Sequence, residues 1–211
     1  MTVNGIEKFI GTGVYYGAAM TEAATYKDMD VCVLGGANSA GQGALFFSKY
    51  AKTVTMIVRA SSLEKSMSNY LVERIKVTPN IKVITETELC SASGSSKLEK
   101  VTLKNIPDGR IYILDTSAIF IFIGAAPRTE MLKGIIETDD KGYILTGPDL
   151  PRINNIVKGW NLERDPYLLE TNVPGVFAAG DVRSGSSKRV AAAVGEGSAC
   201  VGMVHKYLET V

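Results

Sequence analysis

The sequence has little charge imbalance and few residues of the kinds that bind metals or form disulfides. Its 211 residues include 23 basic and 22 acidic side chains, a formal net charge of +1, one histidine and three cysteines. A nearly neutral chain has no general electrostatic attraction to nucleic acid or to an anionic membrane. We therefore expect neither as a partner, and any basic binding site must be local.

The rare residues also exclude several kinds of site. Cys32, Cys90 and Cys200 are far apart and form neither a C-x-x-C pair nor a zinc spacing, which is typical of reduced thiols in a reducing compartment. His205 has no potential metal ligands at suitable spacing, so no metal site is predicted. The chain has neither a signal-peptide pattern nor an apolar run long enough to span a membrane, and we expect a cytoplasmic protein.

What the sequence does contain is an alternation of buried strands and amphipathic helices. Residues 30–34 (DVCVL) and 53–58 (TVTMIV) are short apolar runs typical of strands buried on both faces. A helix is predicted from Asn38, which can cap it, and another from a capping box at Ser61 and Glu64. This order predicts an α/β fold with a Rossmann-like parallel sheet and crossover helices. The apolar stripes of the two helices are Ala40, Ala44, Phe47 and Ala51, and Leu63, Met67, Tyr70 or Leu71, and Ile75.

The pattern changes after residue 81. Short alternating segments at 82–84, 86–92, 98–103 and 110–114 predict a small antiparallel meander. Residues 118–123 (AIFIFI) then predict a strand that returns to the parallel sheet, and residues 176–179 another strand. Helical periodicity from Val190 to Leu208 predicts a long final helix. We predict a lead-in segment (1–25), a nucleotide-binding domain (26–137) and a second domain's C-terminal part (138–211).

The turn at residues 35–40 (GGANSA) lies between the first predicted strand and helix, where Rossmann-type domains hold a dinucleotide's diphosphate. Gly35 permits a tight turn, Ala37 is small enough for the backbone to approach the phosphates, and Ala40 lets the helix pack on the strand. The unpaired amides of the helix start then attract negative charge. A purely structural tight turn is the alternative. The predicted cofactor-binding residues are Gly35, Gly36, Ala37, Asn38, Ser39 and Ala40.

The residue that ends the second strand indicates which nicotinamide nucleotide binds. A carboxylate there would bind a ribose 2′-hydroxyl and repel a 2′-phosphate, but this chain has Arg59. A guanidinium followed by Ser61 and Ser62 is suited to cradle a phosphate. NADPH is therefore favoured over NADH, with a solvated surface arginine as the alternative.

Together with two further motifs, these residues resemble the thioredoxin reductase family of flavoproteins over nearly the whole chain. Residues 11–16 (GTGVYY) resemble the family's lead into its active-site segment, and GGANSA resembles its nucleotide turn. Residues 122–127 (FIGAAP), with Gly124, look like the strand that closes its NADPH domain, and 175–182 (GVFAAGDV) resemble its second flavin-binding motif. The resemblance implies that Gly180 and Asp181 contact the FAD ribityl region. It also implies that Lys188, Arg189 and Val190 open a helix whose dipole faces the flavin ring.

Three departures from the family bear on activity and on the choice of cofactor. Residues 17–20 (GAAM) stand where the family carries Cys-x-x-Cys, so dithiol exchange by the usual route is excluded. No G-x-G-x-x-G precedes residue 30, so half of an FAD site is missing. Of the family's arginines around the 2′-phosphate, only Arg59 is matched, which weakens the preference for NADPH.

We therefore expect an NADPH-dependent flavoprotein oxidoreductase that lacks the dithiol, has no assigned catalytic residue and binds FAD only together with the missing half. The sequence does not identify the electron acceptor, and it leaves open whether the full-length protein is a homodimer. The alternatives are a nucleotide-binding sensor or regulatory module, and an inactive fragment.

Overall fold

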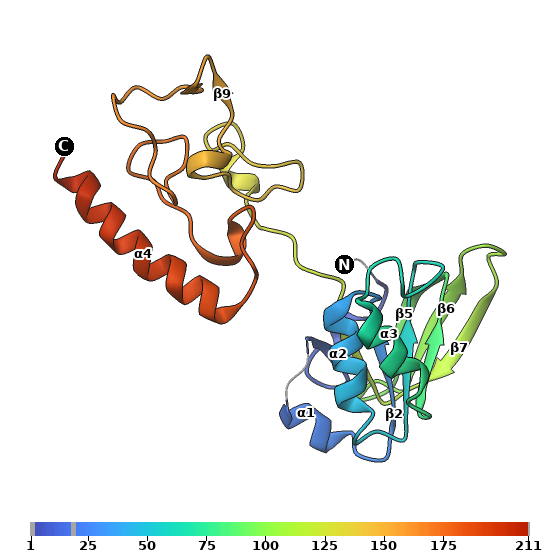
Figure 1. Ribbon diagram of the computed structural model, residues 1–211. Helices are drawn as coiled ribbons and strands as arrows, with labels where there is room; N and C mark the ends of the chain where they lie inside the picture. Colours follow the sequence, from blue (N-terminus) through green and yellow to red (C-terminus); the bar gives the residue numbers. More distant parts are fainter. Residues whose placement is uncertain (1–2, 18–19, 211) are drawn as a thin grey trace. The chain divides into compact units, whose positions relative to one another are not determined.

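The computed structural model describes residues 3–17 and 20–210, which form two units divided between Gly124 and Ala125 (Figure 1). This division differs from the predicted one at both ends of the nucleotide-binding domain. Val14 to Tyr16, in the predicted lead-in segment, form a strand of the first unit's main sheet. Residues 125–137 group with the second unit rather than with the first.

The first unit contains a five-stranded parallel sheet, which confirms the predicted α/β class. Its strands are joined by crossovers rather than by tight hairpins, because parallel strands all begin at the same end of the sheet. The order of strands is β1 (Val14–Tyr16), β8 (Ala118–Ile121), β2 (Asp30–Leu34), β3 (Thr53–Ile57) and β4 (Ile81–Ile84).

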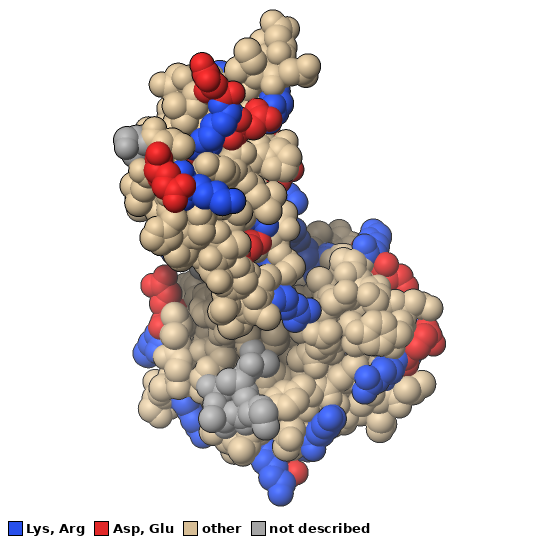
Figure 2. Space-filling view, turned by 60° about the vertical axis from the view of Figure 1, so that its left-hand side comes forward, with Lys and Arg blue, Asp and Glu red and all other residues tan. Residues whose placement is uncertain are grey.

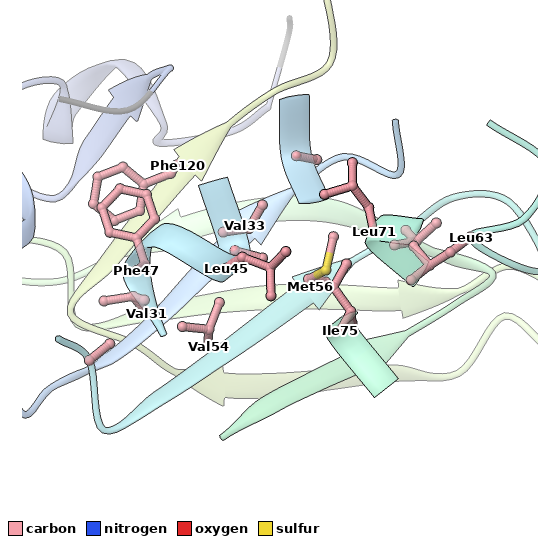
Figure 3. Close-up of a cluster of buried hydrophobic side chains, with 14 of the residues drawn as sticks. Val31, Val33, Leu45, Phe47, Val54, Met56, Leu63, Leu71, Ile75 and Phe120 are labelled. Atoms are coloured by element: carbon pink, nitrogen blue, oxygen red, sulfur yellow. The ribbon is translucent and has the colours of Figure 1, made fainter. Parts of the chain in front are cut away.

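Helices cover this sheet through a core of aliphatic and aromatic side chains (Figure 3). The predicted stripe of α2 (Asn38–Phe47) is confirmed for Ala40, Ala44 and Phe47, which are all buried. Ala51 is also buried, but it lies beyond the end of the helix. The rings of Phe47 and Phe120 stack with their centroids 3.8 Å apart, which joins α2 to β8 (Figure 3). The other helices of this unit are η1 (Glu7–Phe9), α1 (Met20–Thr25) and α3 (Asn69–Lys76).

A three-stranded antiparallel sheet forms the predicted meander, with one correction. Its strands are β5 (Thr87–Ser93), β6 (Lys100–Asn105) and β7 (Ile111–Asp115). Residues 82–84 were predicted to belong to it, but β4 instead pairs in parallel with β3. As the edge strand of the parallel sheet, β4 is only partly covered by other elements. It mixes apolar and charged residues, a pattern that is also typical of an antiparallel strand.

The second predicted helix begins later than the capping box indicated. Helix α3 starts at Asn69, so Ser61 and Glu64 lie in the preceding loop. Leu63, Met67, Leu71 and Ile75 are nevertheless all buried, and Tyr70 is exposed. The apolar pattern therefore identified the buried residues correctly, although its first half belongs to turns.

The second unit consists mainly of loops and ends in the long predicted helix α4 (Val190–Leu208). Its 3-10 turns and short strands are η2 (Glu130–Leu132), η3 (Gly147–Asp149), η4 (Gly180–Val182), β9 (Arg152–Ile153) and β10 (Ile156–Val157). The prediction of a strand at residues 176–179 is wrong, because only a single bridge joins Phe177 to Glu170.

The face in Figure 2 shows basic and acidic side chains interspersed. Within the described residues, no helix has the length and apolarity needed to span a membrane.

Candidate nucleotide-binding site

A cavity of about 660 Å³ lies in the first unit, beside the carboxyl ends of β2, β3 and β8. In open α/β sheets this edge is where ligands bind, because the strand-to-helix turns there leave a crevice. Five of the predicted residues line the cavity, namely Gly35, Gly36, Ala37, Arg59 and Gly124. The lining also includes residues 34, 57, 58, 60, 66, 87–89, 122 and 123.

Both glycines of the turn are required by close packing. Gly35 has φ +143°, and a Cβ on it would lie 2.6 Å from the Phe122 carbonyl oxygen. A Cβ on Gly36 would lie 2.8 Å from Cγ1 of Val58. The Gly35 amide donates to the Ile57 carbonyl at 3.0 Å, which fixes the turn to the neighbouring strand. Side chains at these positions would therefore push the turn away from the sheet.

The turn leaves a row of backbone amides without partners. Helical hydrogen bonding begins with the Gly41 amide, which donates to the Ala37 carbonyl at 3.1 Å. Within residues 3–17 and 20–210, the amides of residues 36–40 donate to no other residue. Ala40 is buried against the sheet, and Ser39 is exposed. Such unpaired amides at a helix start favour an anion.

Asn38 does not cap its own helix as predicted. The residue at the cap position is Ala37, and no side chain caps α2. Instead, Oδ1 of Asn38 accepts a hydrogen bond from the Ser68 amide at 2.7 Å, which links the starts of α2 and α3. Neither Asn38 nor its neighbours Ser39 and Ala40 line the cavity.

Arg59 is exposed at the cavity and has no ion pair among the residues that the structure describes. Ser61 and Ser62 do not line the cavity, although they follow Arg59 closely. The pKa of Glu64 is lowered by its own backbone amide, by the Ser62 hydroxyl and by Lys76. Ser66, which sequence reasoning did not select, does line the cavity. Its place follows from how the loop folds, for which the sequence carries no local signal.

The residues predicted to contact a flavin lie in the second unit. Gly180 and Asp181 form η4, and the Gly180 amide donates to Oε2 of Glu196 at 2.6 Å. Glu196 also accepts two hydrogen bonds from Arg183, at 3.2 and 2.5 Å. The Arg183 guanidinium is the main reason that the pKa of Glu196 lies below its usual range. Glu196 therefore ties the Gly-Asp turn to α4, a role that the sequence motif did not indicate.

The segment before α4 is also held by its neighbours. Lys188 has φ +52°, and its ammonium lies 3.5 Å from the centroid of the Tyr143 ring. The Tyr143 hydroxyl donates to the Ala125 carbonyl at 2.6 Å. Arg189 occupies the cap position of α4, and Val190, its first helical residue, is 84% exposed.

The three cysteines are free thiols. Cys32 is buried, and burial raises the pKa of its thiol to about 12. Residues 17–20, the predicted counterpart of a Cys-x-x-Cys, contain no cysteine, and residues 18 and 19 lie outside the described residues. No group of three potential metal ligands occurs within the residues that the structure describes.

Comparisons with known proteins agree with this architecture. Residues 1–197 match the family described as pyridine nucleotide-disulphide oxidoreductase. Among curated proteins, the chain is 30% identical over 202 residues to a 34.2 kDa protein in the rubredoxin operon of Clostridium pasteurianum, covering 96% of this chain and 58% of that protein. It is 32% identical over 187 residues to the thioredoxin reductase of Streptomyces coelicolor, covering 89% of this chain and 52% of the relative.

Solved structures give the same result. The Lactococcus lactis thioredoxin reductase superposes with a TM-score of 0.77 at 25% identity, over 100% of this chain and 63% of its own. The T. acidophilum enzyme gives 0.73 at 28% identity, over 99% of this chain and 61% of its own. The chain thus spans between half and two thirds of the length of these relatives. With the matching family, sequence relatives and fold, the chain belongs to the pyridine nucleotide-disulphide oxidoreductases and is thioredoxin reductase-like.

Proposed function

We propose that the first unit binds NADPH and that the chain is the nucleotide-binding part of a flavoprotein oxidoreductase. The observation that carries this proposal is one cavity bordered both by the unpaired amides after Gly35 and by the unpaired guanidinium of Arg59. The amides suit a diphosphate, and the guanidinium suits a 2′-phosphate. We propose that four residues next to these groups in the chain also contribute to nucleotide binding, namely Ser39, Ala40, Ser61 and Ser62.

The chemistry of the bound nucleotide would be donation of a hydride to a flavin, with the two electrons passing on to an external acceptor. The described residues fit only part of an FAD site. Asp181 lies in η4, and the segment of Lys188, Arg189 and Val190 opens α4. The chain has no second glycine-rich turn for the adenosine half. We therefore propose that FAD binds only when a polypeptide equivalent to the relatives' remaining length is present.

The exposed surface of α4 supports this proposal. None of its 19 residues is buried, although they include Val190, Val194, Val201 and Leu208. Apolar side chains in one helix normally face a packing partner. The part of the family fold that this chain does not span is the proposed partner.

Calorimetric titration of the 211-residue chain with NADPH and NADH tests the nucleotide assignment. We expect NADPH to bind about tenfold to a hundredfold more tightly than NADH, because a hydrogen bond to a charged group contributes about 1.5–3 kcal/mol. Arg59→Ala should remove this difference. Arg74→Ala, which changes an exposed arginine of α3 outside the cavity lining, should keep it. Failure of the wild type to bind either nucleotide would refute the proposal.

A nucleotide sensor without turnover is a second candidate. The absence of cysteine at residues 17–20 favours it, because the chain has no dithiol at that position to receive electrons from a flavin. The two candidates differ in colour once the missing half is supplied by co-expression. A yellow protein that NADPH bleaches is an oxidoreductase, whereas a colourless complex that binds NADPH is a sensor.

A further inference from the structure

The loop between Arg59 and α3 contacts the glycine-rich turn and the start of α2 at three points. Ser66 donates its hydroxyl to the Gly36 carbonyl at 2.9 Å, and the Ser68 amide donates to Asn38 at 2.7 Å. The buried side chain of Met67, between these two residues, packs where a Cβ on Gly41 would stand, 2.7 Å from its sulfur. Three contacts to residues 36–41 therefore hold the loop where the capping-box pattern predicted a helix.

The bond from Ser66 acts on the peptide group that carries a cavity amide. The Gly36 carbonyl and the Ala37 N–H belong to one peptide unit, and all described peptide bonds are trans. In a trans peptide the C=O and N–H point in opposite directions. Fixing the Gly36 oxygen on Ser66 therefore directs the Ala37 N–H to the opposite side, where no described residue accepts from it.

The bond to Asn38 acts on the next residue of the same turn. Its Oδ1 is occupied by the Ser68 amide, so this side chain is a link between loops rather than a free ligand group. By contrast, the backbone around Arg59 is held independently of this loop. The Thr87 amide donates to the Val58 carbonyl at 3.1 Å, and the Glu86 amide donates to the Ala60 carbonyl at 3.0 Å.

We propose that Ser66 and Asn38 are positioning residues that aim the amides of the glycine-rich turn at the nucleotide's diphosphate. They set the affinity for the diphosphate, whereas Arg59 sets the preference for a 2′-phosphate. The inference rests on the proposed nucleotide site. NADPH and NADH have the same diphosphate and differ only at the ribose. A change in affinity for the diphosphate should therefore affect both nucleotides equally, whereas a change at Arg59 should affect the preference between them.

Calorimetry of Ser66→Ala with both nucleotides tests this inference. We expect the Kd of NADPH and of NADH to rise by the same factor, about fivefold, since a neutral hydrogen bond contributes about 1 kcal/mol. The ratio of the two Kd values should stay at its wild-type value. Ser66→Thr keeps a hydroxyl and should restore most of the affinity. Asn38→Ala tests the second link separately, should Ser66→Ala fail to fold, and should also weaken both nucleotides equally.

The matched control is Ser48→Ala, at the other end of α2. The Ser48 hydroxyl also donates to a backbone carbonyl, that of Leu45, at 3.0 Å, but Ser48 does not line the cavity. This variant should keep both affinities. A lowered melting temperature for Ser66→Ala with unchanged Kd values would reduce Ser66 to a structural residue and overturn the inference. Loss of NADPH binding alone would also overturn it, by placing Ser66 in the 2′-phosphate site. If the wild type binds neither nucleotide, the proposed function itself fails.

Discussion

The two principal helices of the chain, α2 and α4, have similar compositions and different surroundings. Both are rich in alanine, glycine and large apolar residues. In α2 most of the ten residues are buried, whereas none of the 19 residues of α4 is. The difference teaches that an apolar helix face predicts packing without identifying the partner. For α2 the partner is the parallel sheet of the same unit. Within the second unit, α4 is held through Glu196, which binds Gly180 and Arg183, without burial of any of its residues.

The largest effect that would test this comparison is expected in the core of the first unit. Phe47 is buried and stacks on Phe120, so Phe47→Ala should lower the free energy of unfolding by about 3–5 kcal/mol. Val201→Ala in α4 removes a side chain that is 57% exposed and should change it by less than about 0.5 kcal/mol. Urea unfolding followed by circular dichroism measures both. Equal losses would mean that α4 is packed in solution.

A second large effect is expected at Glu170, which shows that the second unit has firmly packed parts away from α4. Its carboxylate is 0% exposed and accepts hydrogen bonds from Arg164 at 2.6 and 2.9 Å, and from the amides of Tyr167 and Gly175, both at 2.9 Å. Breaking a buried ion pair leaves a charge without its partner, so Glu170→Gln should cost about 3 kcal/mol. Fluorescence of Trp160, the single tryptophan, monitors the unfolding of this unit.

The same ion pair predicts a pH dependence. Burial opposes ionisation of Glu170, but the Arg164 guanidinium and the two amides outweigh it and hold the pKa of the carboxyl below its usual range. The stabilisation is therefore complete above the ordinary glutamate pKa of about 4.3, and it is lost as the pH falls through the lower folded value. Glu170→Gln should show little of this acid-dependent loss. A variant that loses stability on acidification as steeply as the wild type would contradict this assignment.

A smaller pair of effects concerns glycines in the two helices. A Cβ on Gly43 in α2 would lie 2.7 Å from Cζ of Phe122, whereas a Cβ on Gly197 in α4 would have nothing within 4 Å. Gly43→Ala should therefore destabilise the first unit by about 1–3 kcal/mol through overpacking. Gly197→Ala should stabilise the helix by about 0.5–1 kcal/mol, because alanine loses less backbone entropy. Thermal melts of both variants would show opposite shifts, and a destabilising Gly197→Ala would indicate a covered α4.

Much of the first unit could be predicted because its signals are local. Buried parallel strands appear as continuous apolar runs, and the stripe of Ala40, Ala44 and Phe47 fixes the face of α2. The start of α3 could not be predicted in this way. Ser66 and Ser68 find partners thirty residues earlier in the chain, and these hydrogen bonds compete with the helical hydrogen bonds that a capping box favours.

Part of the candidate site was also predicted from local signals, and part was missed. The turn of Gly35 and Gly36 was identified from its strand-turn-helix context, and these residues do line a cavity with Arg59. Ser66 and Glu196 were missed, since each contributes through a contact that depends on tertiary structure. At residues 176–179 an apolar run suggested a strand, but no adjacent strand within the described residues pairs with it beyond one bridge.

The position of β1 has a practical consequence for dividing this protein. This strand pairs with β8 throughout its length, and Val14 is fully buried. A fragment that began at residue 26 would leave one side of the apolar β8 strand without hydrogen-bonding partners and open to other chains. Unprotected edges of this kind promote aggregation. Strand β1 therefore protects the edge of β8, and a fragment prepared as a separate nucleotide-binding domain should retain it.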